Sequence, residues 1–251
     1  MRKSSLITII FSLIVSTCFA WGRSGHVIIG LIAEDHLSEK SKQALADILG
    51  EVKLSEADLW MDRQVDTKTY KQQANWHYAF KDKEFSDNGV KKIEHYVTVL
   101  KDPKASQEDQ LMAIRVISHT IGDIHNPIHC AYYKDDAGHG AKVEWQGSGE
   151  KSNLHKVWDT DLLKMRNWND EQYTQELEKG ITDAKLKEWQ NTDVASWAFE
   201  SQTYIDQMYD FTDDKLDKSY YEKNIATVDL RMSQAGIRLA YLLNSIFDST
   251  I

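Results

Sequence analysis

The chain has 251 residues, of which 41% are hydrophobic and only 2 are prolines, and its formal net charge is −9. This length favours one domain around a single core. The acidic balance argues against a protein that binds nucleic acid through a broad basic groove, so a polyanionic ligand would need positive charge from bound metal ions.

The first twenty residues have the layout of a secretory signal peptide. Arg2 and Lys3 form a basic start, an apolar run covers residues 6–15, and small residues lead to Ala20. The apolar run is too short to span a bilayer comfortably, which argues against an uncleaved membrane anchor. We therefore expect cleavage after Ala20, export to the periplasm or out of the cell, and one domain over residues 21–251.

The two cysteines are divided by this cleavage. Cys18 would leave with the signal peptide and Cys130 would remain alone, so no intrachain disulfide is possible although the compartment would permit one. Acylation of Cys18, as in a lipoprotein, is an alternative that Thr17 before it fits poorly. Bound metal could replace the stabilising role of a disulfide.

The remaining chain has apolar residues at helical spacing in segment after segment. Residues 27–49, 107–124, 196–209 and 221–247 show this period, whereas no alternating strand pattern extends beyond a few residues. Residues 134–152 contain four glycines and predict a long loop of the kind that often carries function. The pattern predicts a single all-α, multi-helical domain.

One of these helical segments carries a candidate metal site. His119 and Asp123 are four residues apart, so a helix would place both side chains on one face, where they could chelate one ion. The Asn126-Pro127 step then breaks the helix and allows His129 to turn toward a second ion.

A second pair repeats this spacing at His155 and Asp159, and Asp62 and His77 form a looser set. Imidazole and carboxylate donors without thiolates suit zinc. A single His–Asp pair would more often be a surface contact on a helix. Two such pairs and further donors in one short domain indicate a metal centre.

The start of the mature chain would add another kind of donor. Cleavage after Ala20 would give Trp21 a free α-amino group, with its carbonyl oxygen and His26 within reach of the same ion. An α-amine with a pKa near 7.7–8.0 loses its proton readily when a metal competes for it.

Together these motifs resemble the trinuclear-zinc nucleases, which include fungal single-strand-specific nucleases and plant bifunctional nucleases and are related more distantly to bacterial zinc phospholipase C. The resemblance covers residues 21 to about 163. It is carried by Trp-x4-His from Trp21, Trp-x-Asp, Trp-His-Tyr, His-x3-Asp-x5-His and Asn-Leu-His-x-Val-Trp-Asp. It implies the helical fold of the phospholipase C/nuclease type.

The resemblance also implies three zinc ions and their ligands. The first ion would be held by Asp62, His77, His119 and Asp123. The second would be held by the Trp21 amine and carbonyl, His26 and the other oxygen of Asp123, and the third by His129, His155 and Asp159. His125 is not a ligand in the family, so we expect it to be structural or to orient a ligand.

The implied function is that of a zinc-dependent endonuclease and 3′-nucleotidase. It would cleave single-stranded RNA or DNA and 3′-nucleotides to 5′-phosphate products through a hydroxide that bridges two zinc ions. Asp62 and Asp123 would be its catalytic carboxylates, and Tyr78 could stack on a base of the substrate. We expect a monomer without stable membrane association.

Three positions depart from the family pattern. Val65 stands where an arginine often stabilises phosphate charge, and Arg63 would point elsewhere on a helix. Ala79-Phe80 replaces an aspartate that reads a base edge, and residues 138–140 read Gly-His-Gly in place of Gly-Gly-Asn. These changes bear on base preference and turnover but leave the zinc ligands intact.

Two alternatives remain open. One is a phospholipase C-like lipid hydrolase, although Asp159 stands where the lipases tend to have glutamate. The other is a zinc-scavenging or structural protein without catalysis, which a closed set of protein ligands would favour.

Overall fold

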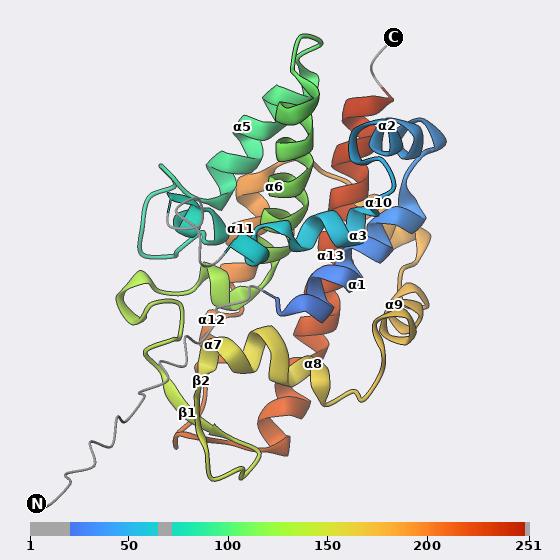
Figure 1. Cartoon of the computed structure of the whole chain (residues 1–251). Coiled ribbons are helices and arrows are strands. Elements are labelled where there is room, and N and C mark those ends of the chain that lie inside the picture. The colour runs from blue at the N-terminus through green and yellow to red at the C-terminus, as the bar shows by residue number, and fades with distance from the viewer. Residues whose placement is uncertain (1–20, 65–71, 249–251) are drawn as a thin grey trace, which may run out of the picture.

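The computed structural model of the chain describes residues 21–64 and 72–248, and helices dominate this part of the chain (Figure 1). The α-helices are α1 (Arg23–His36), α2 (Glu39–Leu49), α3 (Leu54–Ala57), α5 (Gly89–Lys101), α6 (Gln107–His125), α7 (Leu154–Lys156), α8 (Leu162–Lys164), α9 (Asp170–Glu178), α10 (Asp183–Trp189), α11 (Val194–Gln202), α12 (Ile205–Met208) and α13 (Lys218–Phe247). Short 3₁₀ helices form η1 (Asp58–Trp60), η2 (Asp62–Gln64), η3 (Ala74–His77), η4 (Pro127–Cys130) and η5 (Tyr133–Asp135). A π-helical turn forms η6 (Val157–Asp161). The predicted single, mostly helical domain is confirmed.

Helix α6 lies at the centre of the fold, with α5 along one side and α13 along another (Figure 1). It begins at Ser106, whose hydroxyl accepts a hydrogen bond from the backbone N–H of Asp109 at 3.1 Å. Asp109 and Glu108 also place negative charge at the positive end of the helix dipole. The helix ends at His125, directly before the Asn126-Pro127 step, because proline lacks the N–H that the next turn needs.

Helix α1 packs against α13 and also contacts α6. The approach of α1 to α13 depends on Gly236, because a Cβ there would lie 2.5 Å from Ile32 Cγ2 and 3.0 Å from the carbonyl oxygen of Ile29. This contact seats α1, which carries His26, against the longest helix of the fold.

Two of the predicted helical segments are each divided in the structure. Residues 27–49 form α1 and α2, because Ser38 interrupts the first helix and caps the second by accepting from the backbone N–H of Ser41 at 3.1 Å. Residues 196–209 likewise fall into α11 and α12. An apolar period continues across such a break because both helices pack on the same core.

The predicted long loop at 134–152 is only partly a loop. It contains β1 (Lys142–Trp145) and leads into β2 (Lys151–Asn153), which pair antiparallel, and β3 (Lys215–Leu216) joins β1 in parallel. The turn between β1 and β2 uses positive φ angles at Gln146, Gly147 and Gly149. Strands of two to four residues are too short to show an alternating pattern, so the sequence pattern did not reveal them.

Residues 1–20, the predicted signal peptide, lie outside the described part of the chain, as does Val65. Within residues 21–64 and 72–248, no helix combines the length and the apolar character that a membrane span requires.

Candidate metal centre

The two donors on α6 lie on one face of the helix. His119 Nε2 is 3.4 Å from Asp123 Oδ2, and neither residue has any exposed surface. After the helix ends, the Asn126 side chain accepts from the backbone N–H of Ile128 and begins η4, which carries His129. The spacing of the motif therefore produces the local geometry that the sequence predicts.

A first group of donors surrounds His119 Nε2. Asp62 Oδ1 lies 3.5 Å from this nitrogen and His77 Nδ1 lies 3.1 Å from it. His77 Nδ1 is also 3.0 Å from Asp123 Oδ2. Asp62 is in η2 and His77 ends η3, so segments from both sides of residues 65–71 meet α6 here.

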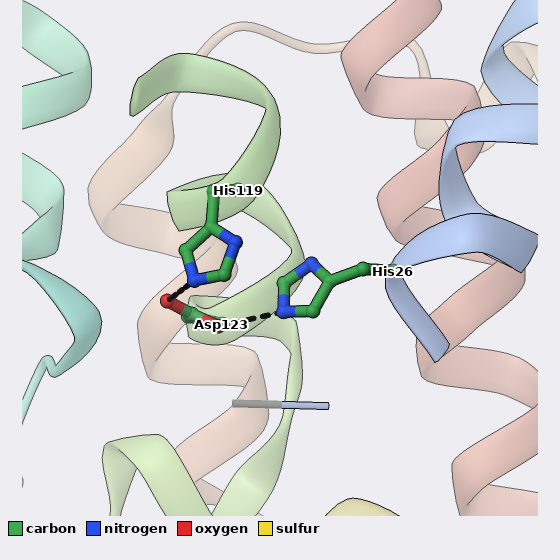
Figure 2. A group of neighbouring side chains, drawn as sticks. All are labelled: His26, His119 and Asp123. Carbon is green, nitrogen blue, oxygen red and sulfur yellow. Dashed lines mark ion pairs between the residues drawn. The ribbon is translucent and has the colours of Figure 1, made fainter. Parts of the chain in front are cut away.

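A second group shares Asp123 with the first. His26 Nε2, from α1, lies 3.4 Å from Asp123 Oδ1, and Figure 2 shows the rings of His26 and His119 both directed at this carboxylate. The two oxygens of Asp123 therefore face different histidines: Oδ1 faces His26, and Oδ2 faces His77 and His119. This is the arrangement that a bridging ligand requires.

Trp21 lies beside this second group. Its indole Nε1 donates to the carbonyl oxygen of Gly122 at 2.7 Å, and the residue is fully buried. Gly22 packs closely on the segment that holds Asp159, because a Cβ at Gly22 would lie 3.2 Å from the carbonyl oxygen of Asp159. The first two residues of the predicted mature chain thus lie between α6 and η6.

A third group consists of His129, His155 and Asp159. His129 Nε2 is 3.3 Å from Asp159 Oδ1, and His155 Nε2 is 2.9 Å from Asp159 Oδ2. Asp159 lies in η6, a π-helical turn, and such turns are frequent at functional sites. The Asn126 amide donates to Asp159 Oδ1 at 2.8 Å and so holds the carboxylate in place.

The Nδ1 nitrogens of three histidines each lie against a backbone carbonyl. The Nδ1 atoms of His119, His129 and His155 lie 2.7–2.8 Å from the carbonyl oxygens of Asp58, His77 and Ala137, respectively. Donation from Nδ1 leaves the Nε2 lone pair for a cation, which is the usual arrangement around protein-bound metals.

The residues present fit a group of metal ions. Each of the eight side-chain donors has at most 4% of its surface exposed. Both ring nitrogens of His26, both oxygens of Asp62, Asp123 Oδ1, His129 Nε2 and Asp159 Oδ2 lack an aligned hydrogen bond. Buried polar atoms without such bonds are costly unless a cation binds them, and imidazole with carboxylate suits zinc.

The electrostatics of the three carboxylates differ. Burial opposes ionisation of Asp123, but the charge of His119 and the close contacts with His26 and His77 outweigh it and hold the pKa of Asp123 well below its usual range. The pKa of Asp159 is lowered in the same way by His155 and His129. At Asp62 burial outweighs the neighbouring histidines and raises the pKa, so a cation beside this carboxylate would favour its ionised form.

His125 lies outside the three groups. Its Nδ1 donates to the carbonyl oxygen of Ile121 at 2.8 Å, and its Nε2 lies 3.0 Å from a guanidinium nitrogen of Arg238. Burial, Arg231 and Arg238 all lower the pKa of His125, which keeps the ring neutral.

Sequence reasoning missed two residues beside the centre. Asp58 is fully buried between His26 and His119, and His139 stacks on His155 with ring centroids 3.8 Å apart. The signal for Asp58 was its position four residues before Asp62, the same spacing that marked the other pairs. His139 was noticed only as a departure from the family pattern.

An aromatic stack leads from the third group to a cavity of about 480 Å³. Tyr78 stacks on His129 and on Phe80, with centroids 5.1 and 4.8 Å apart, and Phe80 meets Tyr133 edge to face. The residues that line the cavity are Asn75, Phe80, Lys83, Glu84, Ser86, Asp87, Asn88 and Tyr133. Phe80 and Tyr133, and not Tyr78, are the rings that face this cavity.

A helical domain with three buried groups of imidazoles and carboxylates, two of which have histidines that face one aspartate, has the donor set of a multinuclear metal-dependent hydrolase. Residues 21–248 match the S1/P1 Nuclease family, and the chain belongs to this family. The resemblance inferred from the motifs is thereby confirmed, and the chain is a nuclease-family enzyme whose family implies a nucleic-acid substrate.

Similar proteins come from plants and fungi. Endonuclease 2 of Arabidopsis thaliana is 27% identical over 90% of each chain. Nuclease S1 of Aspergillus oryzae is 24% identical over 91% of this chain and 92% of its own. Nuclease P1 of Penicillium citrinum is 25% identical over 92% of this chain and 99% of its own. The match therefore covers almost the whole of each protein.

Proposed function

We propose that this chain is an exported three-zinc phosphodiesterase that cleaves single-stranded RNA or DNA, and 3′-nucleotides, to products with a 5′-phosphate. The observation that carries the proposal is the sharing of Asp123: its two oxygens face His26 on one side and His77 and His119 on the other. Such a carboxylate can hold two ions close together, which is the arrangement that phosphoryl-transfer chemistry uses.

The nine ligands would be divided as the resemblance implies. Asp62, His77, His119 and Asp123 would hold one ion, His26 and Asp123 with Trp21 a second, and His129, His155 and Asp159 a third. When bound, zinc supplies Lewis acidity and positive charge at the phosphate. That charge would allow a chain with a net charge of −9 to bind a polyanion.

The chain's own residues would position the substrate. Asp123 and Asp159 hold the centre, and the buried surroundings exclude bulk water and strengthen electrostatic interactions at the phosphate. In the adjoining cavity, Phe80 and Tyr133 offer aromatic faces to a base, and Lys83 lies 4.0 Å above the Tyr133 ring. Tyr78 would support Phe80 through their stacking contact.

A substrate panel tests the reaction. Protein that begins at Trp21 is offered single-stranded RNA, single-stranded DNA, duplex DNA, a 3′-nucleotide and phosphatidylcholine, with and without a zinc chelator. We expect chelator-sensitive cleavage of the single strands and dephosphorylation of the 3′-nucleotide. Cleavage of the lipid alone would replace this proposal with the phospholipase alternative.

A second experiment tests the N-terminal ligand. In the 251-residue precursor the Trp21 nitrogen belongs to a peptide bond, so the amine would exist only after cleavage. A variant with one extra methionine before Trp21 should lose most activity, because its amine is displaced by a residue. Full activity of this variant would show that the amine is not a ligand.

A further inference from the structure

Asp58 is a fully buried carboxylate that lies beside the metal centre but in none of its three groups. It begins η1, four residues before Asp62, and packs against α1 and α6 through His26 and His119. A buried carboxylate is expensive unless polar partners compensate it, so its position calls for an explanation.

Asp58 contacts two imidazole rings at the edge that carries Nδ1, which we call the outer edge. Asp58 Oδ1 lies 2.9 Å from His26 Nδ1 and 3.5 Å from His119 Nδ1, and the Asp58 carbonyl oxygen lies 2.7 Å from His119 Nδ1. The inner atoms, Nε2 of both rings, each lie 3.4 Å from an oxygen of Asp123. Asp58 and Asp123 therefore flank the same two rings from opposite edges.

The rings of His26 and His119 are in direct stacking contact. His26 and His119 stack with centroids 4.0 Å apart and planes 10° from parallel. Figure 2 shows them reaching Asp123 from different helices, His26 from α1 and His119 from α6. A single group that touches the outer edge of both can fix their mutual orientation.

His26 differs from His119, His129 and His155 in the closest group that faces its Nδ1. In His119, His129 and His155 this nitrogen faces a backbone carbonyl, whereas in His26 it faces the Asp58 carboxylate. A neutral imidazole carries one N–H, and the negative charge of Asp58 2.9 Å from Nδ1 favours the proton on that nitrogen, which leaves the Nε2 lone pair for a metal ion. A carboxylate acceptor also makes the ligating nitrogen more basic.

We propose that Asp58 is a positioning residue that selects the metal-binding tautomer of His26, holds His26 against His119, and thereby sets the affinity of the two ions that share Asp123. The proposal rests on the metal centre of the proposed function. Asp58 is not assigned as a ligand itself, because its Oδ1 contacts the Nδ1 atoms of His26 and His119, whereas the Nε2 atoms of these rings lie toward Asp123.

The test measures zinc affinity directly by competition with a chromophoric chelator, on protein that begins at Trp21. Asp58→Ala should weaken the binding of the two Asp123-linked ions about 10- to 100-fold, as loss of such a partner typically does. Asp58→Asn, which keeps the shape and one acceptor oxygen, should weaken them less. The ion held by His129, His155 and Asp159 should be unaffected in both variants.

A matched control separates positioning from general stability. Asp229 is a partly buried carboxylate that pairs with Arg166, accepts from the Tyr173 hydroxyl and belongs to none of the three groups. Asp229→Asn should change stability and leave all three zinc affinities unchanged. An equal weakening of all three ions by the Asp58 variants would indicate a structural role and overturn the proposal.

The tautomer gives a second readout that does not depend on affinity. In ¹⁵N-labelled, zinc-loaded protein, the ring spectrum of His26 should show a proton on Nδ1 that is slow to exchange, and Asp58→Ala should make it exchange fast. Unchanged exchange in the variant would contradict the inference. Wild-type protein that binds no zinc would instead refute the metal centre, so the two failures are distinguishable.

Discussion

Asp123 presents its two carboxylate oxygens to histidines from three separate segments of the chain. Oδ1 faces His26, and Oδ2 faces His77 and His119. Asp159 has a narrower role, since both of its oxygens face histidines of a single group. The two residues therefore allow the bridge to be tested by counting ions.

Replacing Asp123 by alanine should remove two zinc ions from each chain, whereas Asp159→Ala should remove one. The reason is that the oxygens of Asp123 face histidines of two groups of donors, whereas those of Asp159 face histidines of one. Elemental analysis of purified protein, with circular dichroism to verify folding, measures both. Loss of a single ion from Asp123→Ala would contradict the bridge.

Phe80 is the aromatic residue that we expect to contact a base. Phe80→Ala should raise KM for a 3′-nucleotide roughly 5- to 150-fold, since stacking contributes about 1–3 kcal/mol per base, and should leave zinc content unchanged. Phe80→Tyr keeps the ring and should restore binding. If Tyr78→Ala raises KM while Phe80→Ala does not, the direct contact is with Tyr78.

At the scale of elements, α11 and α13 hold the end of α6 in place. Arg231 of α13 donates to the carbonyl oxygens of His125 and Trp197, and Ser201 of α11 donates to the carbonyl oxygen of Ile124 at 2.6 Å. Glu200 accepts from both Arg231 and Arg238. This network fixes the turn between Asp123 and His129, where the chain passes from one group of donors to another.

Glu200→Gln should lower the free energy of unfolding by about 1–3 kcal/mol at pH 7, because it leaves Arg231 and Arg238 without their counter-charge while Glu200 itself is partly exposed. Burial opposes ionisation of Glu200, but hydrogen bonds from Arg238 and Arg231 outweigh it and lower its pKa. The contribution of Glu200 to the free energy of unfolding is therefore complete when the pH is above about 4.3, the pKa of this group in the unfolded chain. It is lost as the pH falls through the lower pKa of the folded state.

Urea denaturation of both proteins between pH 7 and pH 3, with chelator present throughout, measures this difference. The two stabilities should converge only at the acidic end. Glu222→Gln, which removes a surface partner of Lys218, is the matched control and should change stability by less than about 0.5 kcal/mol. A difference that stays constant with pH would refute the assignment to Glu200.

Gly236 determines how closely α1 and α13 approach each other. Gly236→Ala should destabilise the protein by about 1–3 kcal/mol, because the added methyl group would overlap Ile32 and this overlap outweighs the roughly 1 kcal/mol that alanine gains in a helix. Denaturant unfolding measures the change. Equal or greater stability of the variant would show that the two helices can separate at little cost.

At the scale of the whole molecule, the fold buries four carboxylates in one region: Asp58, Asp62, Asp123 and Asp159 are each at most 4% exposed. Histidines surround them, and metal ions would supply the remaining positive charge. Folding and metal binding are therefore expected to be coupled.

Removal of zinc should lower the melting temperature by roughly 10 °C or more. A ligand at a thousandfold excess over its Kd stabilises by about 4 kcal/mol, and each kcal/mol corresponds to about 2–4 °C for a chain of this size. Thermal unfolding with chelator, and again after zinc is restored, measures this effect. Equal melting temperatures in both states would mean that the centre forms without help from metal.

Much of the fold and site followed from patterns that are local in the chain. The helices 107–124 and 221–247 were predicted because their apolar period is long and uninterrupted, and they appear as α6 and α13. The helix break after His125 followed from Pro127 alone. The division of 27–49 at Ser38 and the strand β3 were missed, because a cap and a two-residue strand leave little trace in an apolar pattern.

The sequence by itself determined the donor types, the pairs His119–Asp123 and His155–Asp159, and the family, because residue identity and helical spacing are local properties. The resemblance had also implied that His26, His77 and His119 meet at Asp123. Only the tertiary structure decided that Asp58 faces the Nδ1 atoms of two rings and that Phe80 rather than Tyr78 lines the cavity. These are contacts between segments far apart in the chain, and they arise from how α1, α6 and the short turns pack together.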